Sequence, residues 1–129
     1  MSTITLTHNN QPKIYMRVAI VGSRDIQGRE EYWYNIICEK VPKNCTEIVS
    51  GGAEGIDSLG RRYAKEHGLL YKEFPPEYGR YGKSAVFIRN AQIVGYAHFV
   101  MAFWNGKSMG TADTIKKCWL SDKPIEIFM

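Results

Sequence analysis

The sequence has few cysteines and no long apolar run, and each shortage narrows the class of protein. Its three cysteines, Cys38, Cys45 and Cys118, are odd in number and form no CxxC pair or histidine-containing cluster. We therefore expect neither a disulfide framework nor a metal site. No stretch reaches the ~20 apolar residues that cross a bilayer, and the polar segment 2–12 lacks the apolar part of a secretory signal. This predicts a cytoplasmic protein with no membrane partner.

The excess of positive over negative charge is also small. Lys and Arg number 17 and Asp and Glu 13, so the formal net charge is +4. This excess suits an anionic ligand, but nucleic-acid binding usually needs a clustered basic footprint. The length of 129 residues fits one domain. Residues 1–15 show no periodicity, so we expect a flexible extension there and a nucleotide-binding domain over 16–129.

Short apolar runs and helical patterns alternate from Met16 onward. Strands are predicted at 17–21, 47–50, 69–74, 98–104 and 124–128, with helices at 30–41, 56–67, 84–96 and from 110. The pattern predicts an α/β fold: a Rossmann-like three-layer sandwich with a parallel sheet of about five strands, in the order 3-2-1-4-5, and helices on both faces. In the helix over 84–96, the stripe expected to face the core is Phe87, Ile88, Ala91 and Val94.

Three strand-to-helix junctions carry glycines and polar side chains: Gly22 to Arg24, Ser50 to Asp57, and Asn105 to Thr111. Glycines let a ligand approach main-chain N–H groups closely, and a helix N-terminus attracts anions. With the predicted strand order, the crevice opens where the first and fourth strands meet. We therefore predict that the three junctions converge on one phosphate site.

The residues of these junctions suggest individual roles. Arg24 could grip a phosphate or a carboxylate with two nitrogens at once. Asp57 could cap backbone N–H groups or hold a ribose hydroxyl, and the sequence leaves both roles open. The ring of Trp104 could stack on a base or simply pack. The predicted ligand-binding residues of the junctions are Gly22, Ser23, Arg24, Ser50, Gly51, Gly52, Ala53, Asp57, Trp104, Gly106, Lys107, Ser108, Gly110 and Thr111.

The order of the motifs resembles the SLOG superfamily, which joins the DNA-processing protein DprA and the Lonely Guy phosphoribohydrolases. The resemblance rests on Val21-Gly22-Ser23-Arg24, Ser50-Gly51-Gly52-Ala53-x-Gly55-Ile56-Asp57, Ile88-Arg89-Asn90 and Ala102-Phe103-Trp104-x-Gly106-x-Ser108-x-Gly110-Thr111. The chain looks most like the small stand-alone bacterial and phage members of the YspA type. This resemblance implies a Rossmann-like fold, a nucleotide-type ligand with no required cofactor, and often a homodimer. It adds Arg89 and Asn90 to the ligand-binding set.

The resemblance to the Lonely Guy enzymes breaks at one position. Those enzymes use an arginine together with the glutamate of a Gly-Thr-x-x-Glu segment. Here the segment ends in Thr114, which cannot act as a carboxylate acid or base. The adjacent Asp113 lies ~100° around the helix. A phosphoribohydrolase would have to use Arg89 and Asp113 as its catalytic pair.

Three functions remain open at this stage. The leading one is binding of a nucleotide or nucleotide-derived ligand, such as a mono- or dinucleotide, NAD or an ADP-ribose-like signal. The second is hydrolysis of the N-glycosidic bond of a nucleoside monophosphate. The third is single-stranded DNA binding as in DprA, which the modest charge disfavours. The segment 77–83, expected to be a long loop, interleaves aromatic and cationic residues in a way that suits a flat charged ligand or a single strand.

Overall fold

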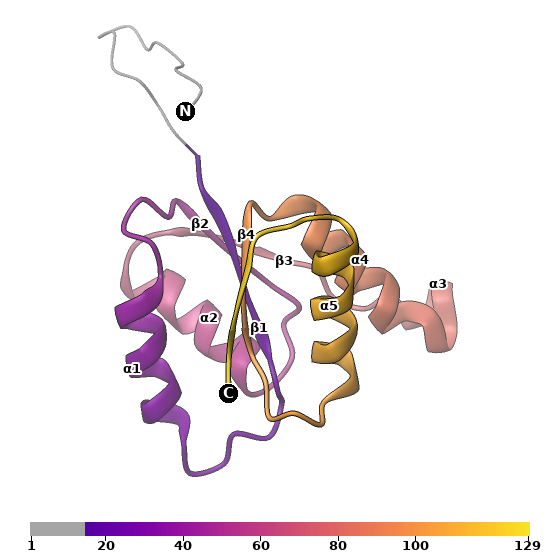
Figure 1. The fold of residues 1–129 in the computed structure, drawn as a ribbon, viewed down its shortest axis with the longest axis horizontal. Coiled ribbons are helices and arrows are strands. Elements are labelled where there is room, and N and C mark those ends of the chain that lie inside the picture. The colour runs from indigo at the N-terminus through magenta and orange to yellow at the C-terminus, as the bar shows by residue number, and fades with distance from the viewer. Residues whose placement is uncertain (1–14) are drawn as a thin grey trace, which may run out of the picture.

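The computed structural model describes residues 15–129, which form a five-stranded sheet covered by helices on both faces (Figure 1). The strands are β1 (Arg17–Gly22), β2 (Glu47–Ser50), β3 (Leu70–Glu73), β4 (Phe99–Phe103) and β5 (Ile125–Phe128). All pairings are parallel, in the order β3-β2-β1-β4-β5. The predicted fold class and strand order are confirmed. The predicted flexible extension lies outside the described residues, apart from Tyr15.

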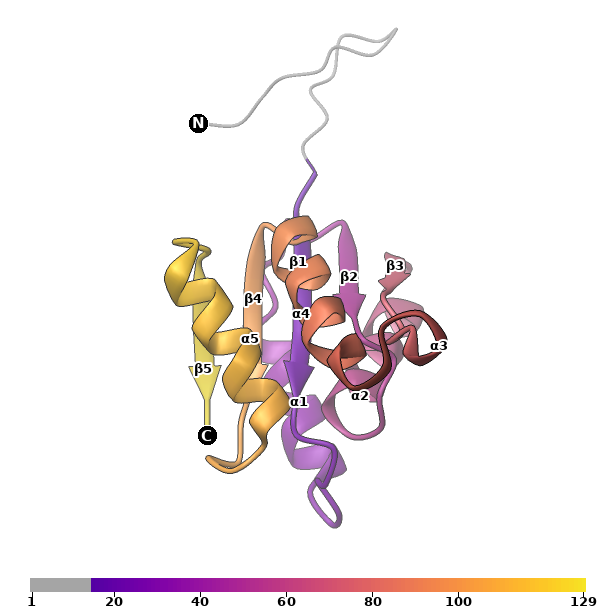
Figure 2. The same ribbon diagram turned by 90° about the vertical axis from the view of Figure 1, so that its right-hand side faces the viewer.

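Two helices cover each face of the sheet. Helices α1 (Glu30–Lys40) and α2 (Ile56–Glu66) pack on one face, and α4 (Ala85–Tyr96) and α5 (Met109–Leu120) pack on the other. Figure 2 shows that the carboxyl ends of β1 and β4 and the start of α5 lie at the same edge of the sheet. No helix within residues 15–129 is long and apolar enough to span a membrane.

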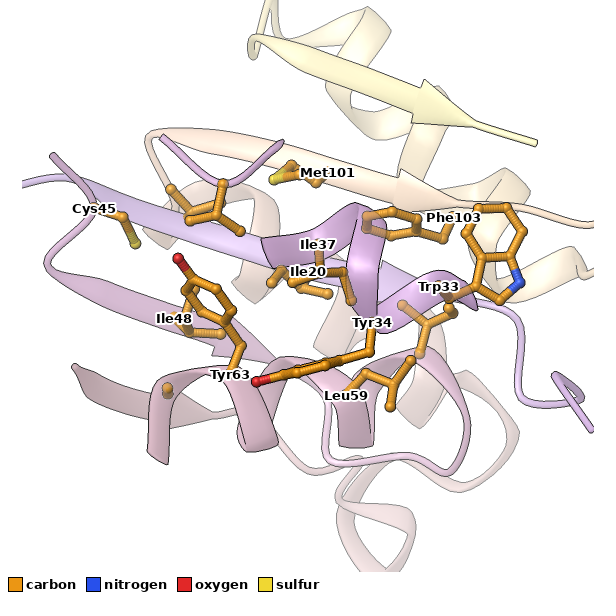
Figure 3. Packing of buried hydrophobic residues seen from close by; sticks show 14 of the residues in the cluster. Ile20, Trp33, Tyr34, Ile37, Cys45, Ile48, Leu59, Tyr63, Met101 and Phe103 are labelled. Atoms are coloured by element: carbon orange, nitrogen blue, oxygen red, sulfur yellow. The ribbon is translucent and has the colours of Figure 1, made fainter. Parts of the chain in front are cut away.

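Alternate residues of the central strands face opposite helical layers. Val18 and Ile20 of β1 belong to the cluster under α1 and α2, whereas Ala19 and Val21 pack under α4 and α5. Figure 3 shows the first cluster, in which Ile20 lies close to Ile37 of α1. Because both faces of β1 are buried, the strand appears in the sequence as a continuous apolar run rather than an alternating one.

The segment predicted as a long loop is largely helical. It contains the one-turn helix α3 (Tyr78–Tyr81), followed by a 3-10 turn η1 (Gly82–Ser84). The carbonyl of Glu77 accepts hydrogen bonds from the N–H groups of Arg80 and Tyr81, each 3.0 Å long. A helix of one turn is too short to leave a periodic apolar pattern in the sequence, which is why a loop was predicted.

The face that helix α4 buries overlaps only in part with the one predicted, because Val94 is buried as expected and Ile88 is partly buried. Phe87 is 44% exposed and Ala91 is exposed, while Arg89, Asn90 and Ile93 are buried. The predicted stripe assumed that apolar side chains alone would face inward. Arg89 is buried because backbone carbonyls at the sheet edge accept its hydrogen bonds, which offsets the cost of burying a charge. As a result, α4 directs Arg89 and Asn90 toward the carboxyl edge of the sheet.

Candidate phosphate site

A pocket of about 340 Å³, here called the phosphate pocket, opens at the carboxyl edge of the sheet on the α4 and α5 side. Its walls come from the end of β1, the loop after β2, the start of α3, one side of α4 and the first turns of α5. Two guanidinium groups and the first turn of α5 face the same space. The lining residues are Val21, Gly22, Arg24, Ala53, Asp57, Tyr78, Val86, Arg89, Asn90, Ile93, Ser108, Gly110, Thr111 and Thr114.

The glycine-rich loop after β2 is already occupied by a carboxylate of the protein itself. Oδ2 of Asp57 accepts hydrogen bonds from the N–H groups of Gly51 (3.0 Å) and Ala53 (3.3 Å). The intervening N–H, that of Gly52, donates to Ser50 Oγ (3.2 Å). Asp57 is 5% exposed, and its burial raises the pKa of its carboxyl group. Of the two roles left open for Asp57, the structure shows the capping of backbone N–H groups.

Arg89 joins this loop to the pocket. Its Nη1 donates to the carbonyl of Gly51 (2.8 Å), and its Nε donates to Asn90 Oδ1 (3.1 Å). Within residues 15–129, Nη2 has no hydrogen-bond partner. Burial lowers the pKa of the guanidinium, nearby Asp57 raises it, and nearby Arg24 lowers it further. An arginine side chain stays charged in proteins, so the pocket contains a fixed positive charge.

The start of α5 offers the open N–H groups that the loop after β2 lacks. Ser108 is the N-cap, and its Oγ accepts from the N–H of Thr111 (3.4 Å). In the part of the chain that the structure describes, the N–H groups of Met109 and Gly110 have no acceptor. These unpaired donors and the positive end of the helix dipole favour an anion beside Gly110.

A hydrogen bond divides the predicted single site into two hollows. The N–H of Asn105 donates to Ser23 Oγ (3.1 Å), and the N–H of Ser23 donates to the carbonyl of Phe103 (3.0 Å). This bridge closes the gap between the ends of β1 and β4. Ser23 and Trp104 therefore line a second pocket, of about 460 Å³, on the α1 side of the sheet. Residues of all three junctions still meet at the phosphate pocket, as expected, whereas Ser23, Trp104 and Asn105 line the second pocket instead.

Comparison with known proteins identifies the family. The profile of a family described as DNA recombination-mediator protein A matches residues 6–71, which is more than half of the chain. The chain belongs to this family. No curated protein matches it closely. The match supports the DprA side of the predicted SLOG resemblance, whereas placement among the stand-alone YspA-type members stays a prediction.

The fold is also similar to that of a solved family member. DNA processing protein A from Helicobacter pylori, whose structure was described for its single-stranded DNA binding mode, superposes with a TM-score of 0.63 at 19% sequence identity. The match covers 87% of this chain and 64% of that one. This chain thus spans less than two thirds of that relative's length. At this identity the likeness shows a shared fold.

Several residues of this chain that were predicted to bind the ligand lie outside the phosphate pocket. Gly106 and Lys107 are exposed and line neither pocket. Ser50, Gly51 and Gly52 lie behind the wall that Ala53 and Asp57 form. Residues 15–129 contain no group of three or more His, Cys, Asp or Glu side chains that could hold a metal ion.

Asp113, the suggested catalytic carboxylate, is held away from the pocket. Its Oδ2 accepts from Lys117 Nζ (2.7 Å) and from Asn90 Nδ2 (3.1 Å). Thr114, at the position of the missing glutamate, lines the pocket but donates its hydroxyl to the carbonyl of Gly110 (3.2 Å). Neither residue therefore presents a carboxylate to a ligand in the pocket.

The structure adds pocket residues that sequence reasoning missed. Val86 and Ile93 lie three residues before and four residues after Arg89 on α4, so helical spacing from Arg89 could have found them. Tyr78 lines the pocket from α3, as the aromatic and cationic composition of its segment suggested in general terms. Arg80, Tyr81 and Lys83 of the same segment do not line it.

Proposed function

We propose that this domain binds single-stranded DNA and holds a backbone phosphate in the phosphate pocket. The observation that carries the proposal is the convergence of Arg24, Arg89 and the unpaired N–H groups at the start of α5 on one small cavity. Membership of the DNA recombination-mediator protein A family supports this function over the free nucleotide favoured by the sequence alone. The small net charge is a weak objection, because these groups act locally.

The charges around the pocket favour an incoming anion. Arg24 and Arg89 are close enough for Arg24 to lower the pKa of Arg89, so their charges repel each other. The acidic side chain that lines the pocket, Asp57, is bound to the N–H groups of its own loop. A phosphate would relieve the repulsion and accept from α5, and an arginine fork matches phosphate oxygens in two directions.

Salt-dependent binding tests the proposal. Fluorescence anisotropy of a labelled oligo-dT strand, titrated at several KCl concentrations, should show affinity that falls as salt rises. Arg24→Ala should weaken binding and reduce the slope of log K against log salt by about 0.7, because one phosphate contact is lost. Arg61→Ala is the matched control, since Arg61 is exposed on α2 and lines neither pocket. Equal effects of both variants, or no binding at low salt, would overturn the proposal.

A free nucleotide-derived ligand is the second candidate. The observation that favours it is the pocket volume of about 340 Å³, because small-molecule ligands usually bind in compact pockets of this size and not in long grooves. Competition separates the two: dTMP, AMP, NAD and ADP-ribose are added to the complex with labelled oligo-dT. Displacement at concentrations far below that of unlabelled oligo-dT would favour the small ligand, and weak displacement would favour the strand.

A further inference from the structure

We propose that the second pocket, hereafter the base pocket, binds a nucleobase of the strand whose phosphate occupies the phosphate pocket. The inference rests on the proposed function and extends it from backbone contact to base contact. The base pocket has a volume of about 460 Å³ and is lined by Ser23, Asp25, Ile26, Gln27, Arg29, Trp33, Phe103, Trp104, Asn105 and Met129.

The inner wall of the base pocket is aromatic and rigid. Trp33 and Phe103 are 7% and 1% exposed, and their ring centroids are 5.7 Å apart at an interplanar angle of 75°. Figure 3 shows the two rings side by side at the border of the core. These two rings are too buried to offer a free face, so they form the apolar floor of the pocket. Stacking on an aromatic side chain, the common mode of binding single-stranded bases, falls to Trp104.

Trp104 is the most accessible aromatic group of this pocket. It is half-buried, and its Nε1 donates to the carbonyl of Ser108 (3.0 Å) while its backbone N–H donates to the carbonyl of Phe128 (2.8 Å). The ring is therefore fixed before any ligand arrives. Ser108 also caps α5, so one residue links the ring of the base pocket to the open N–H groups of the phosphate pocket.

The charges of the base pocket favour a neutral ring over a second phosphate. Asp25 and Arg29 bring one negative and one positive charge, whereas Arg24 and Arg89 bring two positive charges to the phosphate pocket. The guanidinium of Arg29 lies 5.2 Å from the ring centroid of Trp33. Together with Gln27 and Asn105, these groups offer donors and acceptors to the edge of a base.

The two pockets are close enough for one strand to enter both. Gly22 and Arg24 line the phosphate pocket, whereas Ser23 and Asp25 line the base pocket, so successive residues of one loop face opposite hollows. The wall between them is the hydrogen bond from Asn105 to Ser23. A strand that crosses this wall would place a phosphate on one side and a neighbouring base on the other.

Tryptophan fluorescence in a Trp119→Phe background tests the inference. The sequence has three tryptophans, and Trp119 is 81% exposed on α5, so this change leaves only Trp33 and Trp104, both in the base pocket. Oligo-dT should quench the emission. An abasic strand of equal length, which keeps the phosphates, should bind about tenfold more weakly and cause little quenching.

Variants at Trp104 sharpen the test. In the same background, Trp104→Ala should weaken oligo-dT binding about tenfold and leave the abasic strand unaffected, while Trp104→Phe should retain most of the affinity. The abasic strand also controls for damage to the neighbouring phosphate pocket. If both strands bind equally without quenching, the inference fails and the proposed function stands. If neither strand binds, the proposed function fails and the inference fails with it.

Discussion

After β2 the chain turns through glycines into α2, and after β4 it turns through Asn105 and Gly106 into α5. Both junctions have the composition of an anion site, and both lie at the carboxyl edge of the sheet. In the first, the N–H groups of Gly51 and Ala53 bind Asp57. In the second, the N–H groups of Met109 and Gly110 stay open, as judged over residues 15–129. Glycines thus provide the shape of an anion site without determining what occupies it.

The two junctions differ in the second residue of the helix that follows each of them. Asp57 is the second residue of α2, and its side chain reaches back to the loop that precedes the helix. The second residue of α5 is Gly110, which has no side chain to do so. The carboxylate of Asp57 therefore closes the loop after β2. In the loop after β4, Asn105 Oδ1 accepts from the N–H groups of Lys107 and Ser108, and the first two N–H groups of α5 are left for a ligand. Three predictions test this comparison.

The largest expected effect concerns the carboxylate in the closed junction. Asp57→Ala leaves the N–H groups of Gly51 and Ala53 buried without an acceptor and removes a counter-charge from Arg89. We expect the free energy of unfolding to fall by about 3 kcal/mol. For a domain of this size the melting temperature should fall by about 10 °C, measured by calorimetry.

Asp113→Ala, in the second turn of α5, is the matched control. Asp113 pairs with Lys117 four residues away, and both side chains are partly exposed, at 17% and 27%. Pairs of this kind contribute about 0.5 kcal/mol. If Asp113→Ala proves as destabilising as Asp57→Ala, the closed junction is not specially dependent on its internal carboxylate.

A middle-sized effect should follow from closing the open junction. Gly110→Asp places a carboxylate at the helical position that Asp57 holds in α2. There is room for it, since a Cβ at Gly110 would meet only Val86 Cγ1, at 4.0 Å. The new charge should repel a phosphate and weaken oligo-dT binding by about tenfold, because like charges at an interface are unfavourable.

Gly110→Asn is the control for this change. It is nearly the same size as Gly110→Asp but neutral, so it should weaken oligo-dT binding much less. Anisotropy titrations of both variants measure the difference. Equal losses would mean that the side chain blocks the pocket sterically, and the electrostatic comparison of the two junctions would not hold.

The sequence predicted the fold more fully than the site. Strand order followed from alternating apolar runs, because a strand buried on both faces, such as β1, leaves an unmistakable local pattern. The direction of α4 did not follow, because Arg89 is buried through carbonyls from distant loops, including that of Gly51. Likewise, the sequence placed Asp57 near the glycine loop. Whether its carboxylate binds a ligand or the backbone N–H groups of the loop depended on distances that only the structure shows.

The division of the crevice was equally hidden from the sequence. Ser23 and Asn105 are 82 positions apart, and nothing local indicates that the hydroxyl of one accepts from the backbone of the other. Trp104 was expected in the phosphate site because the sequence does not show this hydrogen bond, which separates the two pockets. Its ring lines the pocket on the α1 side instead, while its indole N–H donates to the carbonyl of Ser108. Contacts of this kind become visible only once the two strand ends lie side by side.

The smallest expected effect is a pH dependence confined to the closed junction. Burial raises the pKa of Asp57 above its ordinary value of 3.8, so the folded protein binds this proton at a higher pH than the unfolded chain does. Stability should then rise, relative to Asp57→Asn, as the pH falls toward 3.8, by at most about 1.4 kcal/mol per pH unit. Denaturant unfolding of both proteins between pH 6 and pH 4 measures this difference. A difference that shrinks as the pH falls would mean that the N–H groups of Gly51 and Ala53, together with Arg89, outweigh burial. The loop after β2 would then favour an anion, as the start of α5 is proposed to do.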